Sequence, residues 1–581
     1  MSAVNHLWEK GQLLGLACIF ALTVLVYAGS LDNAFQYDDI HSIVENPHIR
    51  SLANIPAFFY QPELFSADPR NAMYRPLVLV SYALNHALSG DSVWSYHLLN
   101  LGIHLGTSGL LYALVCQLGG TGVQALLAGL LFALHPLGSE PVNYISSRSE
   151  SLCAFFFLLA FLAYLSGGRK WLGLSLAAFV GALLSKSVAI ALPPVFLLYE
   201  LLCRRAAFSW QGIGRRQGPF WLAGFLYIVG VWGALSAAVV THPVRSLAVQ
   251  CLTQVKALVF YLKLLWLPQG LSVEHQFSLA AGLDGTVIAA LLCLGTVGAL
   301  LFLREAKGVL FWVAWAGLTL LPSSAVPLNV LVNEHRLYLP AAAFAVLVGR
   351  MLAALMEERG NAGRALVVAW LGSYGALAWQ RTQVWQGPET LWQDALRQAP
   401  KMPRPHLYMG DVLQQAGRHE EALREYTLTR TVYPQVLSAG DQLVSHNNQG
   451  AAYLALGRRA EAVESYRQAL AIDSTYTKSR EALDALVALQ EKNWDPTAHA
   501  LHKKGLMMII ENRPDEAVKV LEQSLHRQQR LETYMALGMA YEKIGDQAKA
   551  RWAYASLMAL APGSSYARTA AEKLRQLAES K

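Results

Sequence analysis

Charged residues are scarce in this sequence. They make up 15% of its 581 residues, whereas about a quarter of an ordinary soluble protein is charged. The scarcity is uneven, because residues 1–381 contain 39 charged side chains and the last 200 residues contain 48. Hydrophobic residues make up 54% of the chain. The first part is therefore too apolar for a soluble domain, and we expect a boundary near residue 382, between domains 1–381 and 382–581.

Cysteine is also scarce, and the positions of the cysteines argue against a small fold held together by disulfides. All six cysteines lie before residue 382, and no two of them form a C-x-x-C pair, so neither a disulfide framework nor a zinc site is indicated. The net charge of +7 is modest and its basic residues stand between apolar runs. This pattern is typical of membrane topology and does not indicate nucleic-acid binding.

Long apolar runs dominate the first 381 residues. A helix needs about 20 predominantly apolar residues to cross a membrane. The runs predict about eleven spans, at 11–31, 93–118, 121–135, 151–167, 171–185, 188–203, 218–240, 284–303, 308–322, 338–356 and 365–381. We therefore expect an all-α fold, in which a polytopic bundle of membrane helices precedes a more polar helical domain.

Short basic loops predict the orientation of these spans. They contain Arg169 and Lys170, then Arg204, Arg205, Arg215 and Arg216, then Arg304 and Lys307, and finally Arg359 and Arg364. With eleven spans all of them fall on one side, which the positive-inside rule identifies as the cytoplasm. The loop 32–92 and the C-terminal domain then lie outside the cytoplasm. We expect a bacterial inner membrane rather than the endoplasmic reticulum, with the C-terminal domain in the periplasm.

The stretch 249–267 is the weak point of this topology. It is apolar but contains Lys256 and Lys263, and Pro268 follows it. We expect a helix that packs at the outer face or enters the membrane only partly. A full crossing would move the C-terminal domain to the cytoplasm.

Internal repeats follow residue 400. The offsets of Gly, Ala and Tyr repeat three times, and a degenerate copy uses Asn, Ala and Leu; the four sets are Gly417, Ala422, Tyr426; Gly457, Ala462, Tyr466; Gly545, Ala550, Tyr554; and Asn512, Ala517, Leu521. The pattern resembles the tetratricopeptide repeat (TPR), in which a turn glycine and a small alanine let paired helices pack closely. We expect a TPR α-solenoid of four or five repeats with helical connectors, whose groove binds a peptide or a protein.

Ionisable residues next to membrane spans are candidates for function, because they are costly to place there. In the expected topology they gather on the outer side: Asp38, Asp39, Arg75, His135, Glu140, Arg148, Glu150, Lys186, Glu274, His275, Glu334, His335 and Arg336. Acids and bases collected at one face of an apolar bundle predict a site for an anionic substrate carried by the membrane.

Seven segments with these residues resemble one known family. They are FQYDDIHSIVENPHI, YRPLVLVSYALNH, YHLLNLGIH, HPLGSEPVNYISSRSESL, LLSKS, LSVEH and NEHRLYLP, in that order, followed by the repeats. The chain resembles, over essentially its whole length, the TMTC family of transmembrane and TPR-containing O-mannosyltransferases, and we expect a bacterial member. One departure is that Ser187 follows Lys186 where the family pattern has an acidic residue.

The resemblance implies a fold of the GT-C glycosyltransferase class and a definite chemistry. A sugar, expected to be mannose, moves from a polyprenyl phosphate in the membrane to a Ser or Thr hydroxyl of an extracytoplasmic protein. An acidic residue of the first outer loop, Asp38 or Asp39, is the base that takes the hydroxyl proton, and direct displacement inverts the anomeric carbon.

The leaving group is a lipid phosphate, which fixed cations stabilise. The residues expected to bind it are Arg336, Lys186, Arg148 and His335, supported by Glu150, His135, Arg75 and Glu334. No cofactor beyond the lipid-linked donor is firmly implied, and a divalent metal stays open.

Three other functions compete with this one. The first is a transferase that modifies a lipid or a surface glycan. A membrane-anchored TPR scaffold without catalysis would need one span rather than eleven. A transporter would place charges near the middle of broken membrane helices, whereas these charges stand at the ends of spans.

Overall fold

The computed structural model describes residues 10–204, 209–236, 244–303, 307–492, 494–560 and 565–579, and within these ranges every regular element is a helix. Arg205 and Arg304, which were used to predict the orientation, lie outside the described residues. The chain divides into two compact units, Met1–Pro405 and His406–Lys581, which we call the membrane unit and the repeat unit. The structural boundary therefore falls after the change in composition near residue 382.

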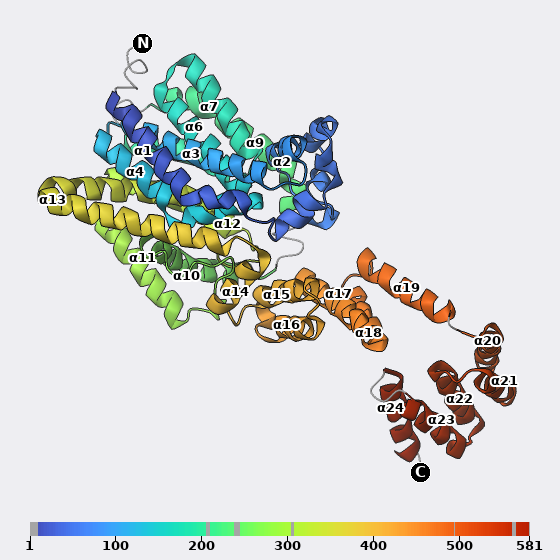
Figure 1. Ribbon diagram of the computed structural model, residues 1–581. Coiled ribbons are helices and arrows are strands. Elements are labelled where there is room, and N and C mark those ends of the chain that lie inside the picture. The colour runs from blue at the N-terminus through green and yellow to red at the C-terminus, as the bar shows by residue number, and fades with distance from the viewer. Residues whose placement is uncertain are drawn as a thin grey trace. The chain divides into compact units, whose positions relative to one another are not determined.

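Every expected span overlaps a helix of the membrane unit (Figure 1). These helices are α1 (Lys10–Tyr27), α3 (Trp94–Gln117), α4 (Gly122–Leu134), α6 (Arg148–Ser166), α7 (Gly168–Leu183), α8 (Leu192–Leu202), α9 (Trp210–Ser236), α11 (Gly285–Leu303), α12 (Lys307–Ala325) and α13 (Tyr338–Val384). Within the described residues, six helical stretches are long and apolar enough to cross a membrane, or seven if the bent pair Gly122–Leu134 and Pro136–Asn143 is one span. The chain is an integral membrane protein with several candidate spans.

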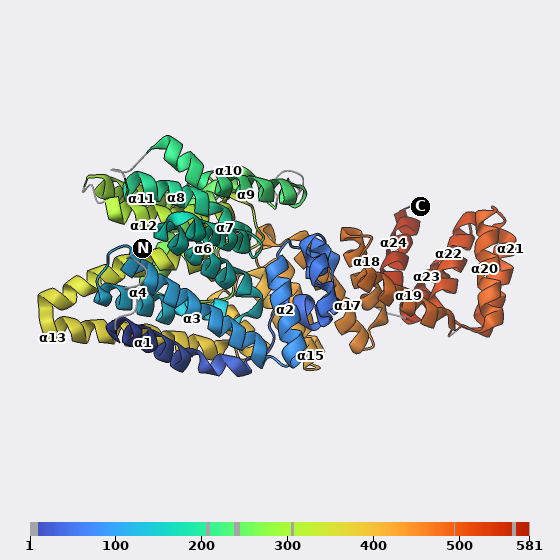
Figure 2. The same cartoon turned by 90° about the horizontal axis from the view of Figure 1, so that it is seen from above.

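Helix α13 contains two of the expected spans. Its backbone leaves the helical conformation at Gly360 (φ 53°, ψ −125°), where a side chain would be strained. Figures 1 and 2 show two arms that leave this break and return to the same end of the unit. Hydrogen bonds agree with this course, because Tyr338 at one end binds His104 and Thr382 at the other binds Asn143.

Close approach between helices depends on small residues, as is common in membrane bundles. A Cβ atom added at Gly349 of α13 would lie 2.9 Å from the backbone nitrogen of Ala128 in α4. One added at Gly129 would lie 2.5 Å from Ile19 of α1. The outer surface is apolar instead, since Leu14, Leu25 and other large side chains stay largely exposed. Such a surface suits contact with lipid tails.

Helix α10 (Leu247–Trp266) corresponds to the stretch whose course was in doubt. Its length and composition satisfy the criterion for a span. Its hydrogen bonds, however, run along one end of the bundle: Gln250 donates to Ser324 O, Tyr261 accepts from Asn333 N, and Leu265 O accepts from His135 Nε2. These contacts join the helix to the loops at that end of the bundle, and its course relative to the membrane stays a prediction.

The loop between α1 and α3 is folded rather than open. It contains short helical turns and the helix α2 (Pro76–Ser89); the turns are η1 (Ala28–Asp32), the π-helical η2 (Ile40–Val44), η3 (Pro47–Arg50), η4 (Leu52–Phe59), η5 (Pro62–Phe65) and η6 (Pro69–Asn71). Ile43, Ile49, Phe58 and Phe65 of the turns pack with Tyr82 of α2 in a small core. This core gives the acidic pair a fixed backbone.

Short elements also join the spans at the same end of the bundle. They are η7 (Pro136–Gly138), α5 (Ser139–Asn143), η8 (Ile145–Ser147), η9 (Ser187–Ala191) and η12 (Glu334–Leu337). After α13, the helix α14 (Pro388–Gln398) completes the membrane unit. We call residues 385–404 the connector, because they lead from α13 to the first repeat.

The repeat unit consists of paired helices, as the sequence predicted. The four pairs within the described residues are α15 (Pro403–Gln415) with α16 (His419–Thr431), α17 (Ala439–Ala455) with α18 (Arg459–Ile472), α20 (Pro496–Ile510) with α21 (Pro514–Arg527), and α22 (Leu531–Ile544) with α23 (Gln547–Leu560). The turn η13 (Pro434–Val436) separates the first two pairs, α19 (Thr477–Lys492) separates the second from the third, and α24 (Ser565–Glu579) follows the last.

The repeated residues have the expected positions within each pair. Gly417, Gly457 and Gly545 have φ values of 76°, 74° and 86°, and Asn512 takes the same left-handed conformation with φ 59°. This conformation ends the first helix of each pair and suits Gly or Asn. Tyr554 packs against a second glycine, since a Cβ atom at Gly538 would lie 2.4 Å from its ring.

Candidate active site

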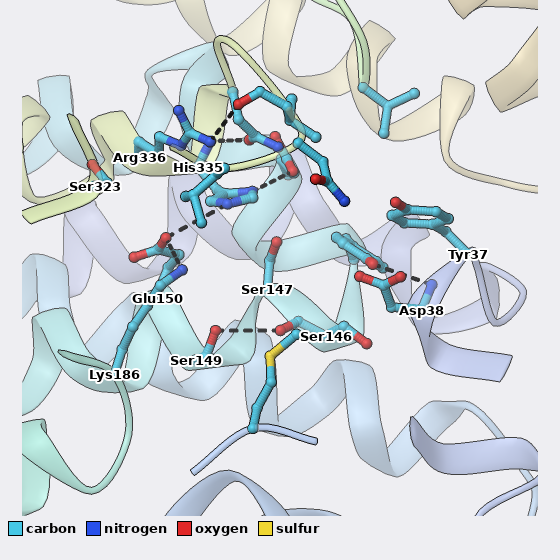
Figure 3. A pocket seen from close by; sticks show the side chains of 18 of the residues that line it. Tyr37, Asp38, Ser146, Ser147, Ser149, Glu150, Lys186, Ser323, His335 and Arg336 are labelled. Atoms are coloured by element: carbon cyan, nitrogen blue, oxygen red, sulfur yellow. Dashed lines mark hydrogen bonds and ion pairs between the residues drawn. The ribbon is translucent and has the colours of Figure 1, made fainter. Parts of the chain in front are cut away.

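A cavity of about 640 Å³ lies where the loops at one end of the membrane unit meet. Its wall comes from the first loop, the start of α6, the residues after α7, the segment 322–336 and the connector. Figure 3 shows Tyr37 and Asp38 on one side and Lys186, Glu150, His335 and Arg336 on the other, with Ser147 between them. The cavity thus brings together residues as far apart in the chain as Tyr37 and Arg404.

Asp38 is the carboxylate of the acidic pair that reaches the cavity. Its side chain is 39% exposed and lies 3.4 Å from His41 Nε2. Its backbone nitrogen donates to the hydroxyl of Tyr144, and Ser42 Oγ donates to its carbonyl oxygen. Tyr37 has a φ of 50°, an uncommon conformation for a tyrosine. The strained residue and these hydrogen bonds fix the direction of the Asp38 side chain.

Asp39 points the other way and is fully buried. Its carboxylate accepts hydrogen bonds from Ser146 N (2.8 Å), Ser146 Oγ (2.5 Å) and Gln36 N (3.0 Å). Burial raises the pKa of Asp39 to about 7, while the hydrogen bonds from Ser146 and Gln36 oppose the shift. Asp39 therefore joins the loop to the start of α6 and does not line the cavity.

A chain of four ionisable groups forms the opposite wall. Lys186 pairs with Glu150. His335 Nε2 lies 3.6 Å from Glu150 Oε1, and its Nδ1 lies 2.7 Å from Glu140 Oε1. Ser187 follows Lys186 at the position where the family pattern has an acidic residue. In this chain Glu150 of α6 provides the acidic partner of Lys186. The predicted residues Lys186, Glu150 and His335 therefore do come together.

Two arginines add positive charge to the cavity wall. Arg336 donates to the carbonyl oxygens of Leu331 and Val330, at 3.1 and 2.8 Å. Arg75 donates to Ser149 Oγ at 3.2 Å. These partners are neutral, so the hydrogen bonds orient both guanidinium groups without neutralising them. Both arginines line the cavity, as predicted.

Arg148 does not have the predicted place. It is fully buried, and its guanidinium donates to Asn100, Ser81, Asn85 and the carbonyl oxygen of Tyr96, at 2.6 to 2.8 Å. Because these partners surround it behind the cavity wall, the geometry contradicts a role in holding the donor phosphate. Arg148 instead joins α6 to α2 and α3.

His135 and Glu334 also lie behind the cavity. His135 Nε2 donates to Leu265 O at 2.9 Å, and its Nδ1 accepts from Leu137 N. Glu334 is buried, accepts from Ser272 N at 2.6 Å and lies 2.9 Å from His275 Nε2. Both residues support the surrounding loops, and neither reaches the cavity.

Sequence reasoning missed several residues of the wall: Tyr37, Tyr144, Ser146, Ser149, Trp392 and Arg404. Tyr37 could have been identified from the sequence, because it is an aromatic residue directly before the acidic pair. Trp392 and Arg404 gave no such signal, because their segment follows the last span and reads as part of the polar domain. As for a metal, no group of three or more His, Cys, Asp or Glu side chains in the described parts of the chain has the geometry to hold one.

Known proteins are similar in sequence to most of this chain. A tetratricopeptide repeat family model matches residues 402–475. The chain is 24% identical over 94% of its length to human protein O-mannosyl-transferase TMTC3, and 26% identical over 74% of its length to human TMTC1. It covers 64% and 56% of those two proteins, so it spans less than two thirds of the relatives it matches.

A shorter region is more similar. It is 35% identical to human TMTC2 and covers 25% of this chain and 18% of that one. Among solved structures, ArnT from Cupriavidus metallidurans bound to undecaprenyl phosphate matches with a TM-score of 0.36 and 16% identity, over 78% of this chain and 79% of that one. A TM-score this low does not establish a shared fold.

The fold and the repeats define an all-helical integral membrane protein with a TPR solenoid. Within that class, the chain is a relative of the TMTC protein O-mannosyl-transferases, and the resemblance first seen in the seven segments is confirmed.

Proposed function

We propose that this chain is a glycosyltransferase that moves a sugar from a polyprenyl phosphate in the membrane to a Ser or Thr hydroxyl of a protein. The observation that carries the proposal is the cavity, with the Asp38 carboxylate on one side and the cations Lys186 and Arg336 on the other. Arg75 adds a third cation to its wall. This polarity suits a reaction in which a proton leaves on one side and a phosphate on the other.

The Asp38 side suits the attacking hydroxyl. A hydroxyl is a weak nucleophile, and a positioned carboxylate accelerates its attack by accepting the proton. Asp38 is half-exposed to the cavity, so the acceptor can reach it, whereas the hydrogen bonds of Asp39 occupy its oxygens. The proposal therefore assigns the base to Asp38 and a positioning role to Asp39.

The opposite side suits the departing lipid phosphate. As the bond between the sugar and the phosphate breaks, negative charge grows on the phosphate oxygens, and fixed cations stabilise it. Arg336 and Arg75 donate to neutral partners, and Lys186 is held in place by Glu150. Pro322, Val326, Pro327 and Leu328 supply an apolar edge to the cavity, suited to a polyprenyl chain.

Attack opposite the leaving group inverts the anomeric carbon. The relatives' names support mannose as the sugar and a protein as the acceptor. The repeat unit supports a protein partner as well, because stacked helical repeats form extended binding surfaces. In this proposal the cavity and the repeat unit lie outside the cytoplasm.

The test is transfer by the purified full-length protein in lipid vesicles, with polyprenyl-phosphate mannose and a protein or peptide rich in Ser and Thr. We expect mannosylated product with inverted anomeric configuration, formed about a thousandfold more slowly by Asp38→Asn. Transfer only to a lipid or glycan acceptor would replace the protein acceptor, and no turnover with any lipid-linked sugar would support a scaffold. Transfer repeated with EDTA would decide whether a divalent ion takes part.

A further inference from the structure

The cavity wall beside Asp38 includes the connector between α13 and the first repeat. Trp392 of α14 lies edge-on to Tyr37, with ring centroids 5.8 Å apart. The guanidinium carbon of Arg404 lies 5.1 Å from the Tyr37 ring centroid. Tyr144 completes the group, 6.0 Å from Tyr37. All four residues line the cavity and belong to the membrane unit.

Several hydrogen bonds fix the connector on the membrane unit. Ala34 N donates to Gln386 O at 3.1 Å, and Gln36 Nε2 donates to Trp385 O at 3.2 Å. A buried ion pair joins Arg381 to Asp394 of α14 at 2.5 Å. At the far end, Lys401 N donates to Gln276 Oε1. The aromatic wall is therefore preorganised, which a precise binding site requires.

We infer that Tyr37, Trp392 and Arg404 form the acceptor subsite, which binds a peptide with an aromatic or other large apolar side chain next to its Ser or Thr. This inference rests on the proposed function. In a displacement the acceptor and the leaving phosphate lie on opposite sides of the anomeric carbon. Tyr37 stands with Asp38, across the cavity from Lys186 and Arg336, so its neighbours face the acceptor.

The chemistry of the wall suits an extended peptide. Aromatic rings bind apolar side chains and stack edge to face with other rings. Arg404 and Glu274 lie 4.0 Å apart in the cavity wall, so a hydrogen-bond donor and an acceptor stand near the rings. A peptide bond also has one donor and one acceptor, which these two side chains complement. The same segment continues into α15, and the tetratricopeptide match begins at residue 402, directly before that helix. The connector thus leads from a protein-binding module to the wall of the cavity.

A kinetic experiment tests the subsite in the full-length protein. The donor is polyprenyl-phosphate mannose, and the acceptors are two synthetic peptides with a single Thr, preceded by Tyr in one and by Ala in the other. We expect the wild type to prefer the Tyr peptide. Trp392→Ala should raise its KM for that peptide about tenfold and remove the preference, because a stacking partner is lost. Its kcat and its KM for the donor should stay unchanged.

Two variants control for general damage. Trp379→Ala removes a tryptophan of α13 that is 52% exposed, and it should behave as the wild type. Trp392→Phe keeps an aromatic ring and should recover most of the preference. Equal KM values for wild type and Trp392→Ala, or an equal rise for both peptides, would overturn the inference.

A binding measurement separates this inference from the proposed function. Asp38→Asn protein, with polyprenyl phosphate present, should bind the Tyr peptide about tenfold more tightly than the double variant that also has Trp392→Ala. Binding that depends on Trp392 without any transfer by the wild type would refute the proposed function and leave a peptide-binding site at Trp392. Transfer with binding that ignores Trp392 would refute the subsite alone. A glycan that binds through Trp392 in place of the peptide would refute the peptide assignment.

Discussion

Asp38 and Asp39 are neighbours in the chain, but they belong to two different regions of the membrane unit. Asp38 belongs to the cavity wall, with Lys186 and Arg336 across from it. Asp39 belongs to a polar layer behind that wall, with Arg148 and His135, where every residue is buried and bonded to protein groups. The two regions use the same residue types, and they differ in what the polar groups face.

This difference separates residues proposed to take part in the reaction from residues that hold the fold together. A buried polar group whose partners are all protein atoms stabilises one arrangement of the chain, and losing a partner is costly. A charged group that faces a cavity keeps its capacity for a ligand. Changes in the cavity wall should therefore alter turnover, and changes in the polar layer should alter stability.

The largest contrast is expected between the two aspartates. Asp38→Asn should lower kcat about a thousandfold, because a general base contributes roughly 10² to 10⁴ in rate. Asp39→Asn keeps an oxygen that can accept from Ser146, so it should lower kcat by less than about tenfold. Rates of mannose transfer for the two purified variants measure the contrast. A similar loss in both would show that the base is not confined to Asp38.

Two arginines offer the next contrast. Arg148→Met leaves the polar groups of Asn85, Asn100 and Ser81 without their donor, so it should destabilise the membrane unit by about 3 kcal/mol. Arg336→Met should change stability by less than about 1 kcal/mol and lower kcat about a hundredfold, because it removes one cation from the leaving group. Thermal unfolding and transfer rates would show whether the two effects separate. An unaltered melting temperature for Arg148→Met would contradict its structural role.

A smaller effect is expected in the repeat unit. Gly538→Ala places a Cβ atom 2.4 Å from Tyr554 and should lower stability by about 2 kcal/mol through overpacking. Gly440→Ala of α17 is the matched control, because its nearest neighbour would be Ser438 Oγ at 3.7 Å. Thermal unfolding compares them, and equal melting temperatures would count against the close packing of the repeats. Transfer to a short peptide should survive both substitutions.

The last contrast is a pH dependence of stability that Asp39 should cause. Its pKa is raised from an ordinary value of 3.8 to about 7, so the folded protein holds this proton more tightly than the unfolded chain. The resulting stabilisation is complete below pH 4 and is lost as the pH rises to about 7. Asp39→Asn lacks this loss, so its melting temperature relative to the wild type should rise between pH 4 and 7. A constant difference over that range would show that Asp39 is ionised in the fold.

The sequence predicted the helices and the repeats well, because their signals are local. Apolar runs located the helices of the membrane unit, and the offset from Gly417 to Tyr426 located the first helix pair. The course of α10 and the break at Gly360 depend on contacts between distant segments. Local patterns do not contain this information.

The candidate site was predicted in part for the same reason. Charge next to a span identified Asp38, Lys186 and Arg336, but charge alone could not tell them from Arg148, whose partners Asn85 and Asn100 lie far away in sequence. The place of Trp392 in the site could not be predicted, because nothing in its own segment shows that the chain returns to the first loop.

The docked connector has a consequence for dividing this protein into parts. A truncation after residue 381, where the composition changes, would remove Trp385, Trp392 and Arg404 and leave the Tyr37 side of the cavity without its wall. It would also leave Arg381 without Asp394. A truncation at residue 405 would keep every one of these contacts. The smallest fragment that retains the complete site therefore ends where the first repeat helix has already begun.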